Sequence, residues 1–130
     1  MTSTHYTAES LLARALEVYN DEHDCFGFAS AVLGVPREGF VQTLIDRTGF
    51  KQVALVSSHQ VLATHNLVVG DVLFFMPYPE TVYKTHVAFY AGAGMLLSKW
   101  GMEPGLIRDT HQVHADHYEP WKTVVLRQLE

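Results

Sequence analysis

This chain of 130 residues has one cysteine, few charged residues and no long apolar run. Because one cysteine cannot form an internal disulfide, nothing in the sequence indicates an oxidising compartment. The nine Lys and Arg residues are scattered and the formal net charge is −5, so we expect no nucleic-acid partner. No apolar segment approaches the roughly 18 residues of a membrane-spanning helix, so we expect no membrane partner either.

The N-terminal segment is neither basic nor apolar enough for a secretory signal, which predicts a cytoplasmic protein unless a partner system exports it. The sequence does not identify such an export partner, or an immunity partner. The length predicts a single domain over residues 1–130, since about 100–200 residues per domain is usual. We expect no cofactor.

Three helices are predicted before Gly49. The second begins after Asp24 as its N-cap and ends at Gly34, because glycine readily adopts the left-handed conformation that terminates helices. The third follows and ends near Gly49. The first has Thr7 as its N-cap, and its predicted apolar face consists of Leu11, Leu12, Ala15, Leu16 and Tyr19.

After Gly49 the pattern favours strands. Glycines at 92 and 94 predict a hairpin turn. Core strands are predicted at 72–76, 86–91 and 95–98, with further candidates at 53–56, 106–108 and 121–126. Helices followed by antiparallel strands predict an α+β fold, in which N-terminal helices pack on a C-terminal antiparallel sheet.

The only cysteine, Cys25, stands where the second helix begins, and His86 lies on a later strand. Unpaired N–H groups at a helix N-terminus lower the pKa of a cysteine and stabilise a developing oxyanion. We expect a partly accessible thiol, with its sulfur within about 3–4 Å of a ring nitrogen of His86, which can then act as its base. A lone cysteine is also commonly a small buried core residue, and the residue types alone leave both interpretations open.

Three segments, 24–28, 69–75 and 86–95, resemble in order and spacing the signature segments of the NlpC-type cell-wall peptidases. The resemblance implies a papain-like fold, with Cys25 as nucleophile and His86 as base. It also implies a peptide or muropeptide substrate, cleaved at an amide of the kind found in peptidoglycan stem peptides of bacteria.

The residue that orients the base in this family is usually a histidine twelve positions after the first, where this chain has Ser98. A serine hydroxyl can accept a hydrogen bond from the imidazole but cannot offset its charge as a carboxylate does. We therefore take Ser98 as the third candidate catalytic residue, with a backbone carbonyl or a histidine of the 111–117 run as the alternative acceptor for His86. The predicted substrate-binding residues are Tyr19, which corresponds to a tyrosine of the family, and Asp24, Lys99 and Trp100.

Two further features leave alternatives open. The histidines at 111, 114 and 117 would share a helix face and could bind zinc, but solvent-facing or structural histidines are the preferred interpretation and we predict no metal site. The apolar loop 77–83 is a candidate rim of the site or a packed hairpin loop.

The predicted function is a cysteine peptidase or amidohydrolase that forms an acyl-enzyme at Cys25. An acyltransferase or transglutaminase-like enzyme would use the same two residues, with an amine or alcohol in place of water. A non-catalytic binding domain of the same fold, in which Cys25 is a core thiol, is the alternative from another class.

Overall fold

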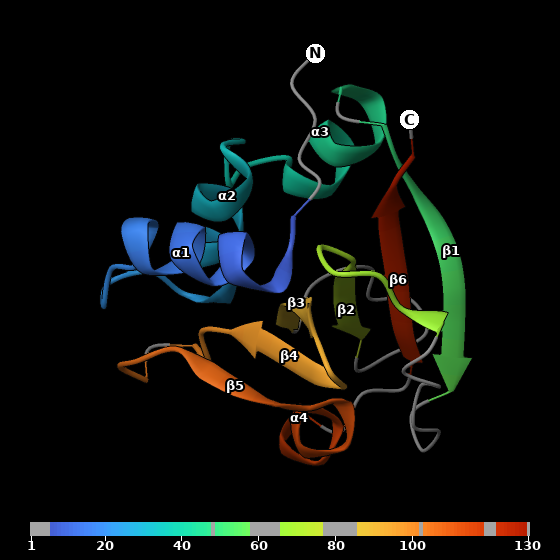
Figure 1. Ribbon diagram of the computed structural model, residues 1–130. Helices are drawn as coiled ribbons and strands as arrows, with labels where there is room; N and C mark the ends of the chain where they lie inside the picture. The colour runs from blue at the N-terminus through green and yellow to red at the C-terminus, as the bar shows by residue number, and fades with distance from the viewer. Residues whose placement is uncertain are drawn as a thin grey trace.

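A computed structural model describes residues 6–47, 49–57, 66–76, 86–101, 103–118 and 122–129. Over these residues the fold is α+β, with four helices and a six-stranded antiparallel sheet (Figure 1). The elements are α1 (Ala8–Val18), α2 (Cys25–Leu33), α3 (Phe40–Arg47), β1 (Phe50–Ser57), β2 (Val72–Met76), β3 (His86–Gly92), β4 (Met95–Ser98), β5 (Ile107–Thr110), α4 (His111–Tyr118) and β6 (Lys122–Gln128). The loop 77–83 lies outside the described residues. No helix among them is long and apolar enough to cross a membrane.

The predicted helix signals are present. The side chains of Thr7 and Ser10 form a reciprocal capping box at the start of α1. Asp24 caps α2, and Gly34 ends that helix in the left-handed conformation with a φ of 69°. Local side-chain chemistry therefore defines where these two helices begin and where α2 ends.

The predicted apolar face of α1 is partly wrong. Leu11 and Ala15 are buried, but Leu12 and Leu16 are 37% and 62% exposed. The reason lies in α2, because Arg14 donates hydrogen bonds to carbonyl groups in the last turn of that helix. These bonds fix the rotation of α1 so that a narrow stripe through Leu11 and Ala15 faces the core.

The sheet has the strand order β1-β6-β2-β3-β4-β5, and the three predicted core strands are confirmed. Gly92 and Gly94 at the turn between β3 and β4 have φ values of 92° and 77°, which glycine adopts without strain. Both faces of the central strands are buried. One face packs on the N-terminal helices through side chains such as Phe74 and Phe89, and the other carries Phe75 and Ala88.

The second face is covered by α4, which lies between β5 and β6 in the chain and on the side of the sheet opposite α1 and α2 (Figure 1). The prediction of helices only in the N-terminal part is therefore incomplete. This helix buries His111, His114 and Ala115. These two histidines are 3% and 0% exposed, so the solvent-facing alternative is wrong for both.

Candidate active site

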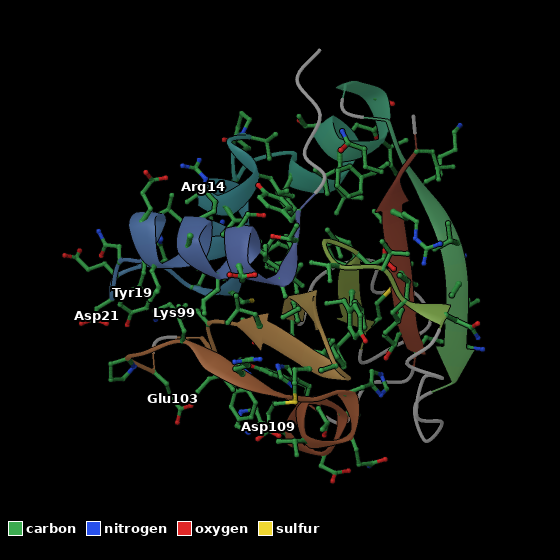
Figure 2. The ribbon with its side chains drawn as sticks, in the orientation of Figure 1. Arg14, Tyr19, Asp21, Lys99, Glu103 and Asp109 are labelled. Atoms are coloured by element: carbon green, nitrogen blue, oxygen red, sulfur yellow. The ribbon has the colours of Figure 1, made fainter. Side chains whose placement is uncertain are left out.

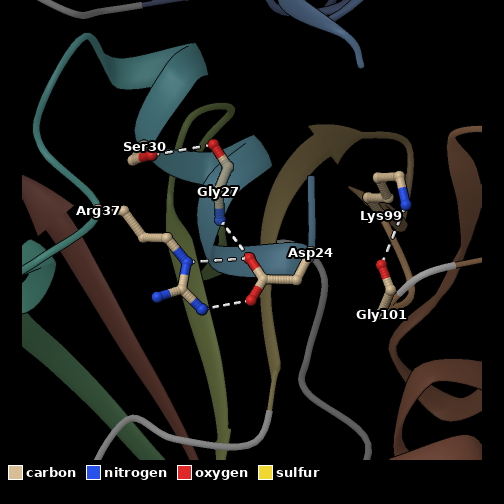
Figure 3. Close-up of polar contacts among 6 residues, drawn as sticks. All are labelled: Asp24, Gly27, Ser30, Arg37, Lys99 and Gly101. Carbon is tan, nitrogen blue, oxygen red and sulfur yellow. Dashed lines mark hydrogen bonds and ion pairs between the residues drawn. The ribbon is translucent and has the colours of Figure 1, made fainter. Parts of the chain in front are cut away.

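The thiol lies at the N-terminus of α2, as predicted. Cys25 is the first residue of that helix, and the carboxylate of Asp24 accepts a 2.7 Å hydrogen bond from the backbone N–H of Gly27. The same carboxylate pairs with the guanidinium of Arg37 (Figure 3), which holds the pKa of Asp24 below its usual range. The cap and the ion pair together fix the helix end that carries the thiol.

The thiol itself is neither partly accessible nor acidic, contrary to expectation. Cys25 is 6% exposed, and burial raises its pKa to about 11. Hydrogen bonding from the backbone N–H groups of Val87, Phe26 and Cys25 itself lowers the pKa, but by less than burial raises it. At neutral pH the thiol is therefore protonated in this conformation, and a base must remove its proton before it can attack.

Tyr118 lies near both Cys25 and His86. The sulfur of Cys25 receives a hydrogen bond from the backbone N–H of Val87, the residue that follows His86 on β3. Tyr118, at the end of α4, stacks on the ring of His86 with a centroid separation of 3.9 Å and an interplanar angle of 14°. Burial raises the pKa of Tyr118, and the charge of Cys25 raises it further, so this ring is close to both residues.

A chain of hydrogen bonds leads away from the other side of His86. Nε2 of His86 lies 3.1 Å from Oγ of Ser98, on β4, so the predicted contact between these residues is present. The same Oγ lies 3.1 Å from Nε2 of His114. Nδ1 of His114 lies 2.9 Å from the carbonyl oxygen of Thr110. His86, Ser98 and His114 are each 0% exposed, so solvent does not compete for these bonds.

The carbonyl at the end of this chain determines its direction. Because a carbonyl only accepts, Nδ1 of His114 must carry a hydrogen, and Nε2 of the neutral ring is then an acceptor. The hydroxyl of Ser98 donates to that nitrogen and accepts the N–H of Nε2 of His86. Nδ1 of neutral His86 is left with a lone pair, and this buried nitrogen has no hydrogen-bond partner among the described residues. The chain therefore holds His86 in the tautomer whose Nδ1 can accept a proton.

The sequence offered a histidine of the 111–117 run only as an alternative acceptor for His86, as a metal ligand or as a structural residue, and it did not single out Tyr118. The signal available was the period of three in the histidines of α4, which places His111 and His114 on one face. Both rings stack on Phe75, with centroid separations of 5.4 and 6.0 Å. The period did not show that this face of α4 packs against the strands that carry His86 and Ser98.

The predicted substrate-binding residues make mainly internal contacts. The hydroxyl of Tyr19 donates to the carboxylate of Asp21 and accepts the N–H of Gly105. Lys99 is 0% exposed and its Nζ donates a 3.0 Å hydrogen bond to the carbonyl of Gly101 (Figures 2 and 3). The polar groups of Tyr19 and Lys99 are therefore engaged in hydrogen bonds within the chain.

Trp100 is the predicted binding residue that joins the cluster around the base. Its ring stacks on His117 at 4.1 Å and meets the ring of Tyr118 edge-on at 5.8 Å. Trp100 therefore contacts Tyr118, the ring that lies over His86.

The described residues contain no group of three His, Cys, Asp or Glu side chains placed to hold a metal ion. Both ring nitrogens of His114 are already engaged, with Ser98 and Thr110. His111 is bonded through Nε2 to the hydroxyl of Thr123 at 3.2 Å. The contacts of these two rings are those of hydrogen-bonding side chains.

A scan against protein-family models found no family that matches the chain. A search of curated proteins also found no match. The resemblance of the three segments to NlpC-type peptidases therefore stays a prediction, and the chemistry of the site is argued below from its own geometry.

Proposed function

We propose that this protein is a cysteine hydrolase that cleaves an amide bond through Cys25 and His86. The observation that carries the proposal is the directed hydrogen-bond chain behind His86, which leaves Nδ1 of that ring as a buried acceptor with no partner in the part of the chain that the structure describes. A buried acceptor without a partner costs stability, and such costs are typical of catalytic groups. The thiol of Cys25 beside Val87 is the nucleophile that this base would serve.

In the first step the proton of the Cys25 thiol passes to Nδ1 of His86, and the sulfur attacks the substrate carbonyl. The backbone N–H of Cys25 at the start of α2 supports the oxyanion that forms. Cleavage of the C–N bond then releases the amine, which takes the proton from Nδ1 of His86. Water, deprotonated by the same nitrogen, hydrolyses the thioester at Cys25 and restores the thiol.

Two features of the site must change for this reaction. The sulfur is hydrogen-bonded to the N–H of Val87, whereas Nδ1 of His86 has no partner, so the thiol must turn toward the ring. Tyr118 covers the ring of His86, so its displacement would open the base to a substrate. In this proposal the structure is the closed form of the enzyme.

The proposed substrate is a peptide or muropeptide amide, as the three family-like segments imply. An α+β arrangement with a cysteine at a helix N-terminus and a histidine on an antiparallel sheet supports the papain-like part of the proposal. The same residues could transfer the acyl group to an amine or alcohol, and analysis of the products would identify that acceptor.

A non-catalytic binding domain is the second candidate, and the burial of Cys25 favours it. A thiol that is 6% exposed, with its pKa raised to about 11, has the properties of a core residue. In that case His86 and Ser98 would serve only to fill and order the sheet face under α4.

Acylation by para-nitrophenyl acetate distinguishes the two candidates without knowledge of the natural substrate. We expect the intact mass of the native protein to rise by one acetyl group, mapped to Cys25, and to return as the thioester hydrolyses. The Cys25→Ser variant is the matched control and should form no thioester adduct. Absence of the adduct on the folded wild-type protein would favour the binding domain and overturn the proposed hydrolase.

A further inference from the structure

On the basis of the proposed function, we infer that His114 is a positioning residue that receives, through the hydroxyl of Ser98, the positive charge created when His86 takes the thiol proton. The inference rests on the unbroken chain His86–Ser98–His114–Thr110, with separations of 3.1, 3.1 and 2.9 Å. Ser98 alone orients the base but cannot carry charge. His114 supplies the group that can.

The transfer moves three protons in one direction. The thiol proton goes to Nδ1 of His86, the hydrogen on Nε2 of His86 goes to Oγ of Ser98, and the hydroxyl hydrogen of Ser98 goes to Nε2 of His114. The products are the thiolate of Cys25, a neutral His86 protonated on Nδ1, an intact hydroxyl, and His114 protonated on both nitrogens. The net charge is unchanged, the two hydrogen bonds of Ser98 reverse their direction, and Nδ1 of His114 still donates to the carbonyl of Thr110.

The surroundings of His114 suit a positive charge better than those of His86. The carbonyl of Thr110 accepts the N–H of Nδ1, and the carboxylate of Asp109, at the end of β5 beside α4, favours the charged ring (Figure 2). Both raise the pKa of His114 against the effect of burial, whereas burial, His114 and His117 all lower the pKa of His86.

Among the described residues, titratable side chains that face His114 lie on β3, β5 and α4 itself. His86 on β3 lies 5.7 Å away between ring centroids, and the rings of Trp100 and Phe75 enclose the same space. His111 and His117 are on the same helix, and each would repel a second positive charge. The negative charge of Asp109 raises the pKa of His114.

The tautomers of the wild-type protein provide a test that does not depend on activity. In nitrogen-15 correlation spectra at neutral pH, we expect His114 to be protonated on Nδ1 and His86 on Nε2. On acidification, His114 should gain its second proton at a higher pH than His86. Protonation of neutral His114 on Nε2, or earlier protonation of His86, would overturn the inference.

The His114→Gln variant tests the role in the reaction. Its amide oxygen can accept the Ser98 hydroxyl as Nε2 does, but it cannot take the proton. We expect acylation by para-nitrophenyl acetate to slow by about ten-fold or more. The control is His111→Gln, one turn earlier on α4 and also stacked on Phe75, which we expect to stay within about two-fold of wild type.

Because His114 acts through Ser98, the double variant Ser98→Ala/His114→Gln should be no slower than the slower single variant. The relay would be ruled out if the rate losses of the two single variants multiplied in the double variant, or if His114→Gln acylated at the wild-type rate. Either result would leave the proposed hydrolase standing. If the wild-type protein forms no acyl adduct at all, the proposed hydrolase is wrong. The tautomers of His86 and His114 would then still show whether the directed hydrogen-bond chain exists.

Discussion

Alanine at Cys25 or at His86 is expected to lower the turnover of para-nitrophenyl acetate by at least about a thousand-fold, to the background rate. The first change removes the nucleophile, and the second removes the base that a thiol with a pKa of about 11 requires. Ser98→Ala should cost only about ten-fold, since the hydroxyl orients the base and connects it to His114 without touching the substrate. Steady-state release of para-nitrophenolate measures all three variants.

The urea midpoint of each variant establishes that it is folded. Should Ser98→Ala be as inactive as Cys25→Ala while folded, the serine would be a full member of the catalytic set. Should His86→Ala keep most of its turnover, the hydrogen-bond chain would have no part in the reaction.

The second large effect concerns stability in acid. Burial, and next the neighbouring His114, lower the pKa of His111 from 6.5 to about 4. His86 and His114 are also buried with lowered pKa values. A group whose pKa is lower in the folded chain than in the unfolded chain contributes its full stabilisation at pH values above its pKa in the unfolded chain. That stability is lost as the pH falls toward the folded value.

We therefore expect the free energy of unfolding to fall as the pH drops from 6.5 to about 4, with His111 alone contributing on the order of 2–3 kcal/mol. Urea denaturation at several pH values in this window measures the loss. His111→Phe keeps a ring against Phe75 and removes the titrating group, so its stability should depend less steeply on pH.

Thr123→Val is the matched control for the acid effect. It removes the same hydrogen bond to His111 but keeps the histidine, so it should lower stability at every pH and leave the slope unchanged. A wild-type protein that is as stable near pH 4.5 as at neutral pH would show that these histidines are not held neutral by burial.

The parts of the fold that the sequence predicted are those set by local chemistry. Thr7, Asp24 and Gly34 mark helix ends through their own side chains or backbone freedom. Gly92 and Gly94 mark a turn through their positive φ values. Such signals need no knowledge of the remaining chain.

The rotation of α1 and the position of α4 depend on contacts between distant segments. Leu12 and Leu16 look as apolar as Leu11, and only the bonds from Arg14 to α2 show which side faces inward. The histidines that made α4 look like a polar or metal-binding segment are the residues that it buries.

At the site, the resemblance to the NlpC-type segments pointed to Ser98, twelve positions after His86 on the adjoining strand, and these two side chains are in contact. The helix N-terminus predicted an acidic thiol, but burial of Cys25, which depends on the whole fold, has the larger effect on its pKa. A histidine of the 111–117 run was only an alternative acceptor, because the contact between Ser98 and His114 joins a strand and a helix that the local pattern does not place together.

The pH dependence of Cys25 alkylation by chloroacetamide tests most directly whether His86 activates the thiol. If the two share a proton, the thiolate fraction does not change with pH once His86 is neutral. The wild-type rate should then be level between about pH 7 and pH 9. In His86→Ala the rate should instead rise about ten-fold per pH unit toward the thiol pKa of about 11. A wild-type rate that climbs as steeply as that of the variant would contradict the activation of Cys25 by His86.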